Sequence, residues 1–266
     1  MALLATDLDG TVIPPERTME RSREIALFHD AVTRAEITLA YVTGRHLAFA
    51  LEGVALTGLP PADYMACDVG TSLYRREAGE YRPDPGYRAE MEQAFGGSDA
   101  AVARRELSSV SGLREQEAAK QAAFKASYYA RWPVRPEQLS EVEGRLTAAG
   151  LVVELVVSRD PITGEGLLDV LPGGVAKHRA LHHLVAELGL ESTDVVYAGD
   201  SGNDRAAFLS GYRAVVVGNA PQALVRELRD AADRGGTAHL LYFAQEKYAA
   251  GVLEGCRHHG LLPVLP

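Results

Sequence analysis

Apolar runs and amphipathic stretches alternate along both ends of the chain. Short apolar runs that predict strands occupy residues 2–6, 37–42, 64–69, 195–198 and 213–217. Helical spacing lies between them, predicting helices over residues 18–34, 177–188, 221–232 and 248–260. Alternation of this kind is typical of βαβ units, so we expect an α/β fold with a Rossmann-like three-layer core around a parallel sheet.

The middle of the chain has a different pattern. Residues 79–166 are rich in loops and charges, with a strand-like run at 123–130, a helix at 137–149 and a strong strand at 151–157. The prolines and glycines at 160–166 predict a hairpin turn. We therefore expect residues 79–166 to form an inserted α+β cap domain, while residues 1–78 and 167–266 form the catalytic core. In this division the apolar run at 167–172 is where the core pattern resumes.

Composition narrows the class of protein. The 266 residues are 47% hydrophobic and 24% charged, as in ordinary globular proteins with a sizeable core. A formal net charge of −9 argues against nucleic acid or an anionic membrane as partner. No apolar run approaches the ~18 residues of a membrane helix, and the chain begins without a targeting segment, so we expect a cytoplasmic protein. Cys67 and Cys256 are expected to be buried and reduced.

Polar clusters follow three of the predicted strands, and a fourth opens a predicted helix. The clusters are Asp7-Leu8-Asp9-Gly10-Thr11, Thr43-Gly44-Arg45, Lys177 and Gly199-Asp200-Ser201-Gly202-Asn203-Asp204. Residues just past the carboxyl ends of neighbouring parallel strands converge on one crevice. Four carboxylates, a hydroxyl and an ammonium would therefore meet there with an excess of negative charge. This composition predicts Mg²⁺, which prefers oxygen ligands, and an anionic substrate such as a phosphate.

These residue types suit phosphoryl transfer through a covalent intermediate. Asp7 is assigned as nucleophile and metal ligand, because a carboxylate can form an aspartyl-phosphate. Asp9 is assigned as general acid for the leaving alkoxide and then as general base for the hydrolytic water. Thr43 and the backbone amide of Gly44 offer neutral donors to phosphate oxygens at a strand-to-helix junction. Lys177 offers a point charge.

A calcium-binding loop is the alternative interpretation of the first cluster. An EF-hand loop follows a helix and has glycine at its sixth position, whereas Gly10 is fourth and follows a predicted strand. The sequence therefore does not support calcium binding at this cluster.

The order of these clusters resembles the haloacid-dehalogenase-like phosphohydrolases with an α+β cap, over nearly the whole chain. Finer features resemble the sucrose-phosphate phosphatase family: Val69-Gly70-Thr71 with Tyr74, Phe124-Lys125-Ala126-Ser127-Tyr128, Leu168-Asp169-Val170-Leu171-Pro172, Val217-Gly218-Asn219-Ala220, and Tyr248-Ala249-Ala250-Gly251 with Glu254-Gly255. The resemblance implies that Mg²⁺ is held by Asp7, the Asp9 carbonyl and Asp200, and by Asp204 directly or through water.

The same resemblance implies a set of substrate-binding positions. Thr43 and Lys177 would bind phosphate, and Asn203 would support the site. The positions facing the substrate would be Gly44, Arg45, Gly70 and Thr71 in the core and Lys125 in the cap. The family also suggests a monomer.

The expected activity is Mg²⁺-dependent hydrolysis of a sugar phosphate, with sucrose 6-phosphate as the first candidate. Another glycosyl phosphate, such as mannosylfructose phosphate or a glycosyl-glycerate phosphate, is the second. A sugar phosphomutase and a non-catalytic regulatory domain are further alternatives. The presence of Asp7, Asp9, Lys177 and Asp200 argues against the non-catalytic alternative, which would be expected to lose one of them.

Overall fold

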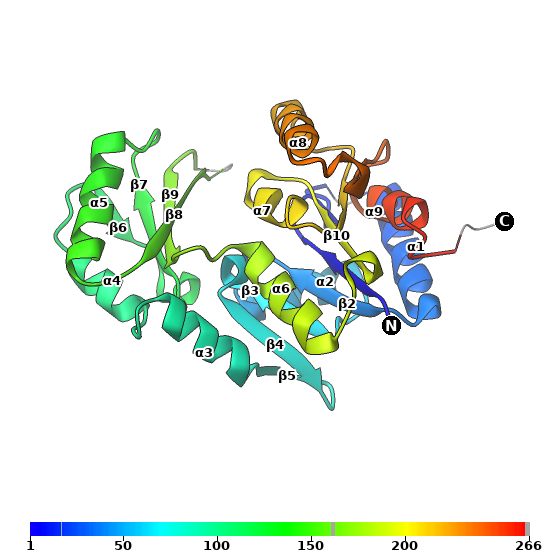
Figure 1. Ribbon diagram of the computed structural model, residues 1–266, viewed down its shortest axis with the longest axis horizontal. Coiled ribbons are helices and arrows are strands. Elements are labelled where there is room, and N and C mark those ends of the chain that lie inside the picture. The colour runs from blue at the N-terminus through cyan, green and yellow to red at the C-terminus, as the bar shows by residue number, and fades with distance from the viewer. Residues whose placement is uncertain (17, 161–162, 264–266) are drawn as a thin grey trace. The chain divides into compact units, whose positions relative to one another are not determined.

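The computed structural model describes residues 1–16, 18–160 and 163–263, and the chain divides into two compact units (Figure 1). The core unit is Met1–Arg82 with Lys177–Pro266, and the cap unit is Pro83–Ala176. The core sheet has the order β12-β11-β10-β1-β2-β3-β4-β5. Its strands are β1 (Leu3–Thr6), β2 (Thr38–Val42), β3 (Tyr64–Cys67), β4 (Ser72–Glu77), β5 (Glu80–Pro83), β10 (Val195–Gly199), β11 (Arg213–Val216) and β12 (Leu241–Phe243).

Helices cover the core sheet on both faces, which confirms the predicted three-layer α/β fold. They are α1 (Met19–Ala35), α2 (Leu47–Thr57), α6 (Lys177–Leu188), α7 (Arg205–Phe208), α8 (Gln222–Gly235) and α9 (Tyr248–His258). Side chains of α1, α2 and α9, such as Phe28 and Val252, share one apolar cluster with Leu4 and Val196 of the sheet. Tyr197, which has the opposite parity on β10, packs its ring against Phe208 of α7. The two sides of the sheet are therefore each sealed by helices.

The parallel register brings three strand ends to one edge of the sheet. Thr6 of β1 lies opposite both Tyr41 of β2 and Ala198 of β10. All three strands run in the same direction and stop within two residues of this level. The loops that begin at Asp7, Thr43 and Asp200 consequently emerge side by side, as the sequence predicted.

The cap unit is an antiparallel sheet with helices packed on it. Its strands follow the order β6-β7-β9-β8. They are β6 (Leu113–Glu115), β7 (Ala126–Ala130), β8 (Val153–Arg159) and β9 (Gly166–Pro172), and the helices are α3 (Pro85–Ala94), α4 (Ala100–Leu107) and α5 (Pro136–Ala148). Val142 and Leu146 of α5 and Ala103 and Leu107 of α4 are buried, as are Leu168 and Val170 of β9. This arrangement is the expected α+β insertion.

The second domain boundary differs from the sequence prediction. Residues 167–172 were assigned to the core, but they form β9, which pairs antiparallel with β7 and β8 of the cap. The cap therefore ends at Ala176 rather than at residue 166, and it begins at Pro83 rather than at residue 79 because β5 joins the core sheet. Part of the predicted 160–166 turn, at residues 161 and 162, lies outside the described residues.

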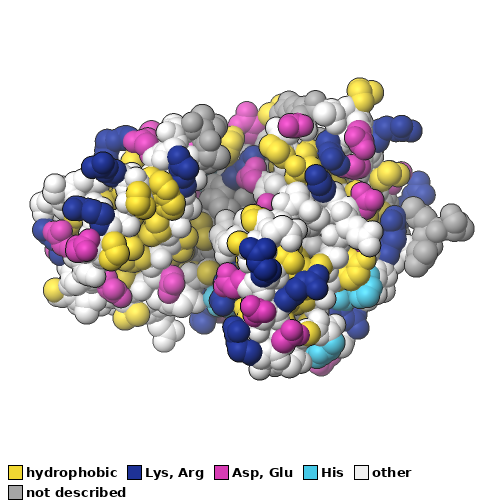
Figure 2. Space-filling model, turned by 90° about the horizontal axis from the view of Figure 1, so that it is seen from above, with side chains coloured by type: hydrophobic (Ala, Val, Ile, Leu, Met, Phe, Trp, Pro, Cys, Tyr) yellow, Lys and Arg dark blue, Asp and Glu magenta, His cyan; other side chains and the backbone are white. Residues whose placement is uncertain are grey.

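Several compositional predictions can be compared with the described chain. Cys67 and Cys256 are both buried and unbridged. Within the described residues, no helix combines the length and apolar character that crossing a bilayer requires. Figure 2 shows basic and acidic side chains interspersed over the face in view. A broad basic surface of the kind that binds nucleic acid is not present on that face.

Candidate active site

A buried ammonium links two carboxylates at the centre of the core edge. Lys177, the first residue of α6, places its Nζ 2.7 Å from Asp7 Oδ1 and 2.7 Å from Asp204 Oδ1. Lys177 and Asp204 are fully buried, and Asp7 is 4% exposed. One cation thus joins Asp7 and Asp204, which lie far apart in the sequence, because β1, β10 and the start of α6 meet at this edge. Removing one member of a buried group of this kind would leave an uncompensated charge, which is strongly destabilising.

Asp200 approaches this group from the loop after β10. The Thr11 hydroxyl donates to Asp200 Oδ1 at 3.1 Å and lies 3.5 Å from Asp7 Oδ2. Gly10 makes the approach possible, because a Cβ at that position would lie 2.4 Å from Asp200 Oδ2. Its φ of +77° also falls in the left-handed region that favours glycine. The first cluster therefore positions Asp200 as well as Asp7.

Asp204 has both of its carboxylate oxygens occupied by donors. Oδ1 accepts from Lys177 Nζ and from the Tyr197 hydroxyl at 2.6 Å. Oδ2 accepts from the backbone amides of Asp200 and Ser201 at 3.1 and 3.0 Å. These bonds fix the Gly199–Asp204 loop and orient the lysine. The structure therefore gives Asp204 a role in building the site, whatever its role toward a cation.

Burial and mutual repulsion raise the pKa values of the two other acids. The pKa of Asp7 is raised to about 7, chiefly by burial, and Lys177 opposes this while Asp204 and Asp200 add to it. Burial and the charge of Asp204 raise the pKa of Asp200 to about 6. Burial alone would lower the pKa of Lys177, but the charges of Asp204 and Asp7 raise it overall. Lys177 is therefore always positively charged. Its single charge is not enough to keep both Asp7 and Asp200 fully ionised.

A divalent metal ion would supply the positive charge that these carboxylates lack. Asp7, Asp200 and Asp204 each offer a carboxylate oxygen, and these three oxygens lie within 4.8 Å of one another. Hard cations such as Mg²⁺ take oxygen ligands of this type. A cation here would favour ionisation of Asp7 and Asp200, whose pKa values are raised without it. The donor set and its electrostatics therefore both suit a magnesium-like ion.

Asp9 lies in a different environment from Asp7. Its side chain is 54% exposed and forms a two-pronged ion pair with Arg45, whose Nε lies 2.7 Å from Asp9 Oδ2. Arg45 Nη1 also donates to the Phe49 carbonyl at 3.2 Å, and its guanidinium lies 4.2 Å from the centre of the Phe49 ring. The structure shows the Arg45 guanidinium bound to Asp9, and its predicted contact with the substrate stays a prediction.

Thr43 is buried in the loop after β2, next to the turn that contains Gly70. The Thr43 Oγ1 accepts from the Arg45 amide at 3.2 Å, and the Thr43 carbonyl accepts from the Val69 amide at 3.1 Å. This second bond attaches η1 (Asp68–Gly70) to the Thr43 loop. Val69 has a φ of +62°, a costly conformation for a β-branched residue, and such strain clusters at functional sites. The turn thus brings Gly70 and the loop of Thr43 and Gly44 together.

Known proteins were compared with the chain. A profile of the sucrose-6F-phosphate phosphohydrolases matches residues 1–260. A mannosylfructose-phosphate phosphatase from Agrobacterium fabrum is 32% identical over 99% of this chain and 98% of its own. A HAD-like hydrolase from Nitrosococcus oceani is 33% identical over 96% of this chain and 71% of its own. The chain belongs to the sucrose-6F-phosphate phosphohydrolase family.

Fold comparison agrees with this membership. The sucrose-phosphatase of Synechocystis, solved in complex with sucrose and phosphate, superposes with a TM-score of 0.78 at 24% identity, over 99% of each chain. As a member of the family, the protein is a phosphoric monoester hydrolase and a sugar phosphatase of the haloacid-dehalogenase-like superfamily. The family resemblance inferred from the motifs is confirmed.

The remaining predicted residues of this family member lie in separate places. Asn203 is exposed, and its Oδ1 accepts from the Ser201 hydroxyl at 2.9 Å, within the loop that Asp204 holds. Thr71 is buried, and its hydroxyl donates to the Asp68 carbonyl at 3.0 Å, closing the η1 turn. Lys125 is buried within the cap unit, just before β7. Thr71 therefore belongs to the η1 turn, Asn203 to the loop after β10, and Lys125 to the cap unit.

Two residues of the site were not predicted from the sequence as functional. Tyr197 was counted as an apolar residue of a strand, yet its hydroxyl binds Asp204. The sequence does indicate a partner for this hydroxyl, because a tyrosine in a fully buried strand needs a polar partner. Asn219 donates to the Gly10 carbonyl at 2.7 Å and accepts from the Tyr248 amide at 3.0 Å. It lies in a family motif, but nothing local to the motif shows that it supports the Asp7–Gly10 loop.

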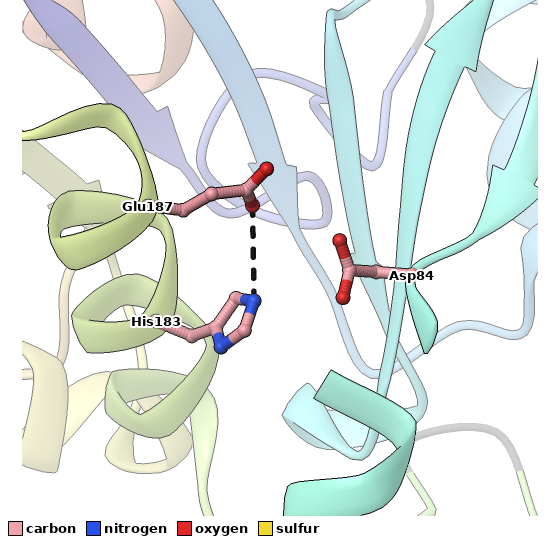
Figure 3. A group of neighbouring side chains, drawn as sticks. All are labelled: Asp84, His183 and Glu187. Atoms are coloured by element: carbon pink, nitrogen blue, oxygen red, sulfur yellow. Dashed lines mark ion pairs between the residues drawn. The ribbon is translucent and has the colours of Figure 1, made fainter. Parts of the chain in front are cut away.

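A second group of potential ligands belongs to helix packing in the core. His183 and Glu187 lie one turn apart on α6, with Nε2 and Oε2 3.7 Å apart (Figure 3). Glu187 also forms an ion pair with Arg75 of β4, so it ties α6 to the sheet. Asp84, labelled in the same view, belongs to the cap unit, where its carboxylate accepts from the Tyr87 amide at 2.7 Å and caps α3. The ion pair with Arg75 already accounts for Glu187.

Proposed function

We propose that the protein is a Mg²⁺-dependent phosphatase that hydrolyses sucrose 6-phosphate to sucrose and phosphate. The observation that carries the proposal is the buried group of Asp7, Lys177 and Asp204 with the half-buried Asp200 beside it, and with Asp9 two residues beyond Asp7. Family membership supports a sugar phosphate as the substrate. The sucrose and phosphate bound to the structural relative from Synechocystis favour sucrose 6-phosphate among the sugar phosphates.

In this proposal a bound metal would be held by Asp7, the Asp9 carbonyl and Asp200, and Asp204 would act through water. Asp204 is assigned to water because both of its oxygens are already engaged by donors. The cation supplies positive charge that offsets the repulsion between the carboxylates and the phosphate. Lys177 supplies a second positive charge, fixed by Asp7 and Asp204 at 2.7 Å each.

The residues of the chain then perform two chemical steps. Asp7 attacks the phosphorus in line while Asp9 protonates the departing sugar oxygen, which leaves an aspartyl-phosphate on Asp7. Asp9, now a carboxylate, removes a proton from water, and that water cleaves the aspartyl-phosphate and regenerates Asp7. Thr43 and the Gly44 amide donate to the phosphate oxygens, where free amides at a helix start favour anions. The proposal also keeps Gly70, Thr71 and Asn203 of the core unit as substrate-binding residues, as the family resemblance implies, and Lys125 as a predicted substrate-binding residue of the cap unit.

Mannosylfructose phosphate is the second candidate substrate. The relative that acts on mannosylfructose phosphate is 32% identical to this chain over almost the full length of both. Both candidates are disaccharide phosphates, so the core chemistry would be the same and the side chains that contact the sugar would decide between them.

A panel of purified sugar phosphates tests the proposal. Phosphate release is measured from sucrose 6-phosphate, mannosylfructose phosphate and a glycosyl-glycerate phosphate, with Mg²⁺ and with EDTA. We expect the highest kcat/KM for sucrose 6-phosphate and loss of release in EDTA. A higher kcat/KM for another sugar phosphate would make that compound the substrate. Phosphate release that persists in EDTA would show that the reaction does not require the metal. The Asp7→Asn variant serves as the control for contaminating phosphatases.

A further inference from the structure

A cavity of about 500 Å³ lies within the cap unit, at one end of its sheet. Residues of β6, β7 and β8 and of the segment before β9 line it. The charged and aromatic members of the lining are Arg114, Tyr129, Arg131, Trp132, Arg159 and Glu165. Cavities that bind small molecules typically span about 300–1,000 Å³. None of the described residues that line this one is assigned to catalysis or to the metal, so the phosphatase mechanism gives the cavity no role.

The cavity is positively charged in a protein that is negatively charged overall. Arg114, Arg131 and Arg159 supply three guanidinium groups, and Glu165 supplies the one carboxylate among the described lining residues. Asp160 lies outside the lining, where its carboxylate accepts from a backbone amide. The formal net charge of the chain is −9, so composition alone does not explain this cluster of arginines. Its excess of positive charge favours a dianion, and a phosphate monoester carries about −1.5 to −2 at pH 7.

The three arginines differ in how far the protein already engages them. Arg114 Nη2 lies 3.2 Å from Glu165 Oε1. Arg159 Nε donates to the Gly164 carbonyl at 3.4 Å. Arg131 is exposed, and among the described residues it has no hydrogen bond or ion pair. Its N–H donors are therefore available to a ligand, in the planar arrangement that binds two phosphate oxygens at once.

One aromatic side chain of the lining is available to a ligand. The Tyr129 ring is already covered, because the Arg114 guanidinium lies 4.2 Å and the Lys120 Nζ 5.0 Å from its centre. Its hydroxyl accepts from Lys120 Nζ at 2.7 Å. Trp132, in contrast, is 40% exposed. Its indole offers a flat apolar surface against which a base or the C–H face of a sugar ring can pack.

The cavity and Lys125 lie at opposite ends of β7. Lys125 immediately precedes the strand, whereas the cavity begins at Tyr129 and continues past the last strand residue, Ala130. At about 3.3 Å per residue, the strand separates Lys125 from Arg131 by roughly 20 Å. Lys125 is the predicted substrate-binding residue of the cap unit. The cavity is therefore separate from it.

We propose that this cavity is a second ligand site, which binds an organic phosphate. The phosphoryl group pairs with Arg131, Arg159 and Arg114, and the ring of the ligand packs on Trp132. A sugar phosphate and a nucleotide share these two parts, so both belong to the class that the cavity recognises. The site is independent of the proposed hydrolysis, since the described lining contains none of the residues assigned to that reaction.

Trp132 is the only tryptophan of the chain, so its fluorescence reports directly on this cavity. The unaltered protein is titrated with glucose 6-phosphate, uridine diphosphate and inorganic phosphate, in EDTA so that the core holds no metal. For at least one organic phosphate we expect a saturable change with a Kd about tenfold or more below that of inorganic phosphate, because only the organic compounds contact the indole. Arg131→Gln should raise this Kd about tenfold or more, the effect of losing a hydrogen bond between charged groups. Arg105→Gln, exposed on α4 and outside the lining, is the matched control.

Calorimetry tests the indole itself. Trp132→Ala should raise the Kd of the same organic phosphate about tenfold, and Trp132→Phe should restore most of the affinity because it keeps an aromatic face. Asp7→Asn should leave the Kd within twofold, since the core site does not take part in this binding.

Four results would overturn the site. They are no saturable signal at millimolar ligand, equal Kd values for inorganic and organic phosphates, an unchanged Kd in Arg131→Gln, and a fall of about tenfold in the kcat/KM of that variant for the best sugar phosphate. The last result would show that Arg131 binds the substrate of the phosphatase. We expect the kcat/KM of Arg131→Gln to stay within twofold of the unaltered protein.

Discussion

Asp7 and Asp9 are two residues apart in one loop, yet their surroundings differ. Asp7 is 4% exposed and is held between Lys177 and Thr11, with its pKa raised to about 7 by burial. The Asp9 side chain is 54% exposed, and within the described part of the chain its one partner is the guanidinium of Arg45. The contrast matches two different tasks. A nucleophile needs a fixed position and compensating charge, whereas a general acid and base must gain and lose a proton and must meet water.

The largest expected effect is at the fixed member of the pair. Asp7→Asn should lower kcat by a factor of about 10³ or more, because the amide cannot form the covalent intermediate. The fold should persist, since asparagine keeps the shape of the side chain. Phosphate release and the urea unfolding midpoint measure the two properties. Residual turnover near that of the unaltered protein would show that Asp7 is not the nucleophile.

The exposed member should give a smaller but still large loss. Asp9→Asn should lower kcat by about 10²–10⁴, the usual contribution of a general acid or base, and should slow both half-reactions. Rapid-quench assays should then reveal phosphorylated enzyme accumulating on Asp7. A steady-state rate within twofold of the unaltered protein would show that Asp9 is not the acid and base.

Metal binding should depend on pH through the buried carboxylates. The pKa values of Asp7 and Asp200 are raised to about 7 and about 6, so Mg²⁺ must displace protons at lower pH. The affinity should therefore rise between pH 5 and pH 7, by up to about tenfold per pH unit for each proton that the metal displaces, and level off above the higher pKa. Calorimetry in buffers of different ionisation enthalpy measures the released protons. An affinity independent of pH in this range contradicts the raised pKa values.

The same shift has an opposite consequence for the metal-free fold. A carboxyl whose pKa is about 7 in the folded protein and 3.8 ordinarily binds its proton more tightly when folded. Its stabilising contribution is present below pH 3.8 and is lost as pH rises through 7. In EDTA the contribution of Asp7 should therefore favour unfolding at pH 8 relative to pH 5. Asp7→Asn should reduce this pH dependence of the urea midpoint.

The smallest expected effect concerns Tyr197, whose hydroxyl donates to Asp204. Tyr197→Phe removes one hydrogen bond to Asp204, which keeps its bond to Lys177. We expect a loss of about 1 kcal/mol in the free energy of unfolding. Tyr81→Phe, which loses a bond to the Ala62 carbonyl away from the site, is the matched control. Tyr197→Phe should weaken Mg²⁺ binding and Tyr81→Phe should not. Equal Mg²⁺ affinities in the two variants would show that Tyr197 does not support the metal site.

The sequence predicted the core and its strand-end residues well because local patterns determine both. Apolar strands followed by acidic turns place Asp7 and Asp200 at one edge, and the parallel register then brings them together. Residues 167–172 were placed in the wrong unit, because Leu168 and Val170 are buried in the cap as they would be in the core. An apolar run alone does not say which sheet it joins.

The Asp9–Arg45 pair could not be predicted for a different reason. It depends on Gly53, where the absence of a Cβ leaves room for the guanidinium one turn beyond Phe49. Sequence patterns report which residues are present on a helix face, and this contact arises from a side chain that is missing. The bond between Tyr197 and Asp204 likewise depends on the three-dimensional path of the loop after β10.

The chain crosses from cap to core between Ala176 and Lys177, so the ammonium that anchors Asp7 and Asp204 is carried by the first core residue. Its two bonds fasten the returning polypeptide at the crossing itself. Recombination that exchanged one cap for another, joined at Pro83 and Ala176, would leave this anchor inside the inherited core. The buried contacts among Asp7, Lys177 and Asp204 would then stay intact while the inserted unit changed.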